Sequence, residues 1–95
     1  MINSFSDKNT EYFFISGKVK KKVGWQSITN IAKRKLDMIH YASVIDDLNS
    51  LPGNQLELLK GKRDGWYSIR INSQWRIIFR WCDNNPEDVA IIDYH

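Results

Sequence analysis

The stretch Tyr67-Ser-Ile-Arg-Ile-Asn-Ser-Gln-Trp-Arg-Ile-Ile-Phe-Arg-Trp81 alternates apolar and polar residues on both sides of a short polar break. Its apolar positions carry odd numbers before and after the break, which is typical of two half-buried β-strands. Both apolar sets share one face only if an odd number of residues lies between the paired positions. A three-residue loop therefore pairs Ile71 with Trp75 in an antiparallel hairpin.

The same register sets Arg70 directly opposite Arg76 on the polar face, which also carries Ser68 and Arg80. Cβ atoms of such partners lie roughly 5 Å apart, and like charges placed so repel each other. Two interpretations are open. A phosphate or an acidic partner could sit between the guanidinium groups, or Asp and Glu neighbours could neutralise them.

Helices are expected upstream of the hairpin. Ser6 or Asp7 can cap a helix that stops near Gly17, after a short first strand from Ile2 to Phe5. An exposed basic loop, residues 18–24, should follow. From Ser27 onward apolar residues recur at spacings of three and four, as on the buried face of a helix: Ile28, Ile31, Ala32, Leu36 and Ile39.

The second half of the chain should form the sheet. A further helical stretch, Ala42 to Leu48, ends at the turn Ser50-Leu-Pro-Gly-Asn54. A short apolar run, Leu56 to Leu59, precedes the hairpin, and Val89 to Tyr94 follows it. Helices followed by an antiparallel sheet indicate an α+β fold, with two or three helices packed on a small sheet in one domain, residues 1–95.

Charge is unevenly distributed along the chain. Residues 18–80 hold 13 of the 14 Lys and Arg residues but five of the 11 acids, so this segment is +8 and the remainder is −5. Such a basic segment suits a phosphate backbone, although solubility alone can also explain it.

One cysteine, Cys82, cannot form an intramolecular disulfide, and His40 and His95 are too few for a zinc site. We expect no metal and no cofactor.

The chain begins without a signal-peptide pattern and contains no apolar run long enough for a membrane span, so we expect a cytoplasmic protein with no membrane partner. It closes on Asp93, Tyr94 and His95, which are all proton-transfer groups.

Of the tryptophans, Trp75 and Trp81 belong to the apolar face and should pack in the core. Trp66 lies outside that register and is a possible surface contact.

A combination of motifs resembles the HigB branch of the RelE-like bacterial toxins. The motifs are Leu58-Leu-Lys-Gly61, Gly65-Trp-Tyr-Ser-Ile-Arg70, Gln74-Trp-Arg-Ile-Ile-Phe79 and the closing Asp93-Tyr-His95. Met1-Ile-Asn-Ser-Phe5 and Arg34-Lys-Leu36 also fit. The resemblance implies the RelE-like fold, endoribonuclease activity on mRNA in the ribosomal A site, and neutralisation by a HigA-like helix-turn-helix antitoxin. DNA would then be contacted only through the antitoxin complex.

The resemblance also implies which residues form the active site. Lys60, Arg70, Arg76, Asp93, Tyr94 and His95 stand where such toxins carry active-site residues. Glu57 stands where some of these toxins have a histidine, which leaves the choice of general base open. We expect a further group to contact the RNA backbone: Lys62, Arg63, Arg80, Lys33 and Arg34.

Metal-free RNA cleavage needs a base for the 2′-hydroxyl, cations for the crowded phosphorane and an acid for the departing 5′-oxygen. We assign Arg70 and Arg76 to the phosphate and Lys60 to backbone charge. His95 and Tyr94 would be base and acid in either order, assisted by Glu57 or Asp93. Two alternatives are a ParE-like toxin that acts by binding a protein, and an RNA- or ribosome-binding module with weak catalysis. The terminal trio, Asp93 to His95, argues against the ParE-like alternative.

Overall fold

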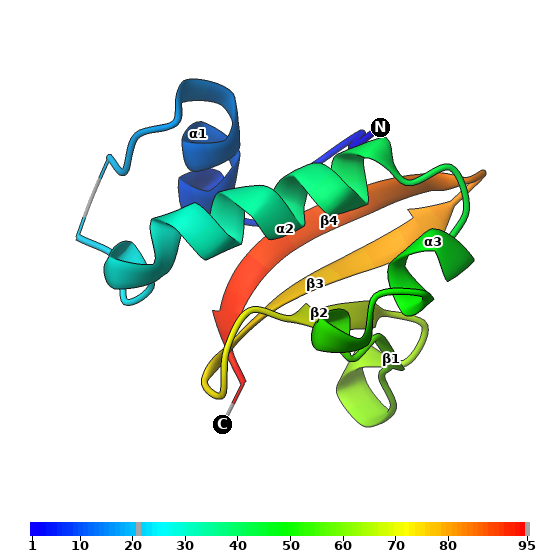
Figure 1. Ribbon diagram of the computed structural model, residues 1–95. Coiled ribbons are helices and arrows are strands. Elements are labelled where there is room, and N and C mark those ends of the chain that lie inside the picture. Colours follow the sequence, from blue (N-terminus) through cyan, green and yellow to red (C-terminus); the bar gives the residue numbers. More distant parts are fainter. Residues whose placement is uncertain (21, 95) are drawn as a thin grey trace.

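The computed structural model describes residues 1–20 and 22–94 and shows helices packed on one face of an antiparallel sheet (Figure 1). The four strands lie in the order β1-β2-β3-β4 and comprise Glu57–Leu58, Tyr67–Arg70, Trp75–Cys82 and Asn85–Asp93. The helices are α1 (Lys8–Ser16), α2 (Thr29–Tyr41) and α3 (Asp46–Asn49). Single 3-10 turns occupy Gln26–Ile28, Pro52–Asn54 and Gly61–Arg63. The predicted α+β architecture is confirmed.

The main core lies between α2 and the sheet, because the odd-numbered residues of the hairpin face the helix. It includes Leu36 and Ile39 from α2 together with Ile69, Ile77 and Phe79 from β2 and β3. Trp75 and Trp81 pack against this cluster, as predicted. The loop pairing is also as predicted, because the Ile71 amide donates to the Trp75 carbonyl at 2.9 Å.

The even-numbered face is less polar than predicted. Ile78 on β3 is buried there with Leu59 and Ala90, and Trp66 packs partly buried against the three of them. Trp66 is therefore only in part the surface contact that its position outside the register suggested. The strand alternation does not reveal this second cluster, because Leu59 reaches the face from outside the hairpin.

The first helix begins and ends where its capping residues predict. The Asp7 carboxylate accepts from the Thr10 amide at 3.0 Å, and Gly17 ends the helix in the left-handed region at φ 75°. The Thr10 hydroxyl in turn accepts from the Ile91 amide on β4 at 3.1 Å. One side chain thus joins the start of α1 to the middle of the last strand.

The predicted strand from Ile2 to Phe5 is reduced to one parallel bridge, between Phe5 and Val89. A longer ladder is prevented because Ile91, the next residue of β4 whose amide points away from β3, donates to Thr10. The basic loop is as expected for Lys18, Lys20 and Lys22, which are exposed, whereas Lys21 lies outside the described residues.

The prediction of a continuing helix from Ala42 to Leu48 is wrong. The chain turns to an extended conformation at Ala42, and the Asp47 carboxylate accepts from the amides of Ser43 and Val44 before α3 begins. These side-chain bonds satisfy amides that a continuous helix would have paired. On α2, Ile31 is 36% exposed while Lys35 is 7% exposed, so the buried face is rotated from the predicted stripe. Every helix in the described part of the chain is too short or too polar to cross a bilayer.

Replacing Thr10 with valine should lower the free energy of unfolding by about 1 to 3 kcal/mol, because the Ile91 amide loses its acceptor in a buried position. Urea unfolding measures the change. Ser16→Ala is the matched control, since the exposed Ser16 hydroxyl donates to Tyr12 and Lys18 and accepts from the exposed Lys18 amide, and it should stay within about 0.5 kcal/mol. A Thr10→Val protein as stable as wild type would contradict the link between α1 and β4.

His40 should make the fold sensitive to mild acid. Its Nδ1 accepts from the Ile2 amide at 3.1 Å. Burial, followed by the N-terminal ammonium, lowers the pKa of His40 from its ordinary value, while Asp37 partly opposes the shift. Protonation is thus disfavoured in the folded state. The stability that His40 contributes is complete above its unfolded pKa, near 6.5, and is lost as the pH falls through the lower folded value.

The thermal midpoint should therefore fall between about pH 7 and pH 5.5 in the wild type. It should fall less in His40→Asn, whose amide oxygen can still accept from Ile2 but does not titrate. Calorimetry at both pH values makes the comparison. Identical pH dependence in the two proteins would show that His40 is not the responsible group.

Candidate functional site

The β2–β3 hairpin sets the position of the site. Arg70 and Arg76 are direct cross-strand partners, as the alternation predicted. The loop is stabilised by the Asn72 side chain, whose oxygen accepts from the amides of Gln74 and Trp75 at 2.9 and 2.8 Å. This turn chemistry holds the register, and the register brings the two arginines together.

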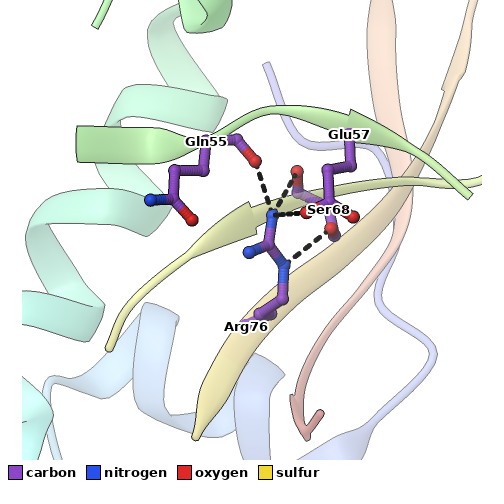
Figure 2. A network of polar contacts seen from close by, with 4 residues as sticks. All are labelled: Gln55, Glu57, Ser68 and Arg76. Atoms are coloured by element: carbon purple, nitrogen blue, oxygen red, sulfur yellow. Dashed lines mark hydrogen bonds and ion pairs between the residues drawn. The ribbon is translucent and has the colours of Figure 1, made fainter. Parts of the chain in front are cut away.

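Arg76 is held almost entirely by oxygen atoms that carry no charge (Figure 2). The residue is 6% exposed. Its Nε donates to the Ser68 hydroxyl at 2.8 Å, and its Nη2 donates to the Gln55 carbonyl at 2.6 Å and the Ser68 carbonyl at 3.3 Å. The Glu57 carboxylate is half exposed and stands 3.7 Å from Nη2. The guanidinium is thus fixed in orientation, with only a loose partner of opposite charge.

Tyr94 lies against the same guanidinium. Its ring centroid is 5.3 Å from Cζ of Arg76, which is a cation–π distance. The Tyr94 amide donates to the Gln74 carbonyl at 2.8 Å, which continues the β3–β4 pairing beyond Asp93. Asp93 accepts from the Gln74 side chain at 3.0 Å. His95 lies outside the described residues. Two of the three terminal residues therefore lie beside the hairpin.

A basic hollow adjoins Tyr94. It encloses about 130 Å³ and is lined by Leu59, Lys60, Lys62, Arg63 and Tyr94. Gly61, with φ 73°, allows the tight turn that carries these cations into one place. Because Tyr94 contacts Arg76 and also lines this hollow, five of the expected residues lie in one continuous cluster: Lys60, Lys62, Arg63, Arg76 and Tyr94.

Three other expected residues have different surroundings. Arg80 pairs with Asp88 at 3.8 Å, and Lys33 pairs with Asp37 at 2.7 Å on α2. Arg34 lies close enough to Lys35 that its charge helps to lower the pKa of that lysine.

Arg70 acts on the same lysine. Burial is the main cause of the lowered Lys35 pKa, and the charges of Arg34 and Arg70 add to it. Arg70 therefore lies within electrostatic range of Lys35 on α2 as well as opposite Arg76 in the sheet.

Several residues in and around the site were not predicted. The Gln55 carbonyl is a backbone group and leaves no signal in a side-chain pattern. Ser68 was placed on the correct face, but its bonds to Arg76 were not foreseen. Lys35 had a usable signal, because it falls between Ala32 and Leu36, at a spacing that puts it on the buried face of α2. In the described residues, no group of three or more His, Cys, Asp or Glu side chains could hold a metal ion.

Comparison with known proteins finds relatives whose similarity extends over most or all of this chain. Residues 3–95 match the family model described as RelE-like toxin of type II toxin-antitoxin system HigB. Toxin HigB-1 of Vibrio cholerae serotype O1 is 41% identical over 87% of this chain and 86% of its own length. Endoribonuclease HigB of Proteus vulgaris is 35% identical over 100% of both chains.

Solved structures share the fold at lower identity. In the YoeB-YefM complex from Staphylococcus aureus, one chain superposes with a TM-score of 0.59 and 20% identity, over 100% of this chain and 98% of that one. A chain of a heterotetrameric YoeB-YefM toxin-antitoxin complex from the same organism superposes with a TM-score of 0.54 and 19% identity. It also covers 100% of this chain and 98% of that one. At these identities the likeness concerns the fold alone. On the family match and the two relatives, this chain belongs to the HigB-like family of RelE-like toxins of type II toxin-antitoxin systems.

Proposed function

We propose that this chain is an endoribonuclease that cuts mRNA in the ribosomal A site without a metal ion. Family membership supports the reaction class, since a relative that aligns with the full chain is named an endoribonuclease. The observation that carries the proposal is the joint placement of a fixed arginine, a partly exposed phenol and a basic hollow. They supply the cations and one of the two proton-transfer groups that metal-free phosphodiester cleavage requires.

Electrostatics favours an anion at this place. The buried charge of Arg76 is hydrogen-bonded mostly to neutral oxygens, so its field is only partly compensated. Lys60, Lys62 and Arg63 add positive charge around the neighbouring hollow. A phosphodiester there would be attracted by preorganised cations that need not rearrange as charge builds up in the transition state.

In the proposed reaction, a base takes the proton of the 2′-hydroxyl, whose oxygen attacks the adjacent phosphorus. The bond to the 5′-oxygen breaks, and an acid protonates the leaving group. Arg76 and Arg70 stabilise the phosphorane, and Lys60 neutralises the backbone. Tyr94, which is 39% exposed, and His95 serve as acid and base in an order that remains open, with Asp93 assisting.

Glu57 can act in two opposing ways in the proposed reaction. Its carboxylate stands 3.7 Å from the guanidinium that would bind the phosphate, so RNA and Glu57 compete for Arg76. A carboxylate in this position can accept a proton from the 2′-hydroxyl, but it also repels the phosphate. Glu57 should therefore weaken RNA binding relative to a neutral side chain.

The proposed partners follow from the family. We propose neutralisation by a HigA-like helix-turn-helix antitoxin, with DNA contacted only through the toxin–antitoxin complex. The ribosome with its mRNA would be the target, which places the activity in the cytoplasm. Lys62, Arg63, Lys33, Arg34 and Arg80 would contact the RNA backbone, the last three less closely than the first two.

Arg76→Ala should slow cleavage of ribosome-bound mRNA by about 10² to 10³-fold, because one preorganised electrostatic contact to the phosphate is lost. Primer extension on ribosome-bound mRNA incubated with purified protein measures the rate and maps the breaks. Lys8→Ala, which removes an exposed charge from α1, is the control and should cut at the wild-type rate. Thermal unfolding establishes that each variant is folded at the assay temperature.

Undiminished cutting by folded Arg76→Ala would refute its role at the phosphate. Absence of breaks with wild-type protein, in any codon context, would refute the nuclease itself. DNA damage in cells without mRNA breaks would instead indicate a toxin that acts by binding a protein.

Two substitutions of Tyr94 distinguish the role of its hydroxyl from the role of its ring. Tyr94→Phe keeps the ring over Arg76 but removes the hydroxyl, so a proton-transfer role predicts a loss of about 10² to 10⁴-fold in the single-turnover rate. Tyr94→Leu removes both and should be no more active. If Tyr94→Phe is fully active and Tyr94→Leu is slow, the ring positions Arg76 and the phenol carries no proton.

A further inference from the structure

A buried lysine outside the proposed active site reaches the same turn as Arg76. Lys35 lies on α2, and its ammonium donates to the Asn54 side-chain oxygen at 2.5 Å and the Gly53 carbonyl at 3.3 Å. The Gln55 carbonyl, two residues after that of Gly53, accepts from Arg76 at 2.6 Å. Acceptors of one short turn are therefore divided between a cation from the helix layer and a cation from the sheet.

The turn is tightly held from within the protein. Asn54 is fully buried, and its amide group also donates to the Leu48 carbonyl at 3.2 Å. Gln55 has φ 44° and ψ 57°, a left-handed conformation that residues other than glycine seldom adopt. Such a conformation persists only where its surroundings hold it. The Gln55 amide donates to the Pro52 carbonyl at 3.3 Å, its carbonyl accepts from Arg76, and Lys35 binds the two residues that precede it in the turn.

The position of Arg76 depends on this arrangement. Gln55 and Ser68 supply its hydrogen bonds, and Figure 2 shows both residues bonded to the guanidinium. If the Gln55 carbonyl rotated away, Nη2 would keep only the longer bond to the Ser68 carbonyl and the pairing with Glu57. The guanidinium could then turn toward the Glu57 carboxylate and away from the place where a phosphate would bind.

We infer that Lys35 and Asn54 are positioning residues for Arg76: they lock the Pro52–Gln55 turn so that its last carbonyl fixes the guanidinium in the orientation used for cleavage. This inference rests on the proposed nuclease function. Neither residue touches the RNA. Their effect passes through the Gln55 carbonyl alone, so it should vanish when Arg76 is absent.

A double-mutant cycle tests the link. Lys35→Met keeps the apolar stem but leaves the turn acceptors without their donor, and it should slow mRNA cleavage by about 10 to 100-fold, since misplacement of a catalytic group by roughly 1 Å can cost about 10². In the Arg76→Ala background the same substitution should change the rate by less than about twofold, because coupled residues are not additive. A merely structural lysine would slow both proteins equally.

Lys8→Met is the matched control for the loss of a lysine, and thermal unfolding sets an assay temperature at which all variants are folded. Should Lys35→Met not fold, Asn54→Asp replaces it in the cycle, because it alters the same turn at constant size. Wild-type cleavage by folded Lys35→Met, or an equal loss in both backgrounds, would overturn the positioning role. Failure of the wild type to cut, or full activity of Arg76→Ala, would instead overturn the proposed function.

Discussion

The hydrogen bonding of Arg76 is the interaction on which the site depends. A guanidinium buried among apolar strands is costly unless its donors are satisfied. Here the donors meet the Ser68 hydroxyl and the carbonyls of Ser68 and Gln55, and the acidic neighbour Glu57 is half exposed and 3.7 Å away. The hydrogen bonds satisfy the donors of the arginine without neutralising its charge, which the proposed function assigns to an RNA phosphate.

The same bonds connect the layers of the fold. Ser68 belongs to β2, Arg76 to β3, and Gln55 to the turn that Lys35 holds from α2. Tyr94, at the end of β4, completes the surroundings by lying on the guanidinium. A site of this kind is assembled from segments that are distant in sequence, so the register of the hairpin and the position of the turn must both be correct before the groups meet.

Local patterns predicted the hairpin and its loop, because alternation and turn chemistry act over a few residues. The facing arginines followed from the same parity argument. Prediction failed where long-range contacts decided the outcome. Leu59 buries Ile78 on the face that was expected to be polar, Thr10 interrupts the N-terminal strand, and Asp47 breaks the helix after Ala42. The neutral acceptors of Arg76 are partly backbone carbonyls, which no side-chain pattern encodes. Lys21 and His95 lie outside the described residues. Of the terminal trio, the structure therefore places Asp93 and Tyr94.

The distance from the Arg76 guanidinium to the scissile phosphate tests the central claim most directly. It can be measured by cryo-electron microscopy of this chain bound to a ribosome whose mRNA carries a 2′-O-methyl group at the cleavage site, which prevents the reaction. The account predicts a phosphate oxygen about 3 Å from the guanidinium, with the contacts to Ser68 and Gln55 unbroken. A phosphate lying beyond about 6 Å, with Arg76 bonded only to Ser68, Gln55 and Glu57, would contradict it.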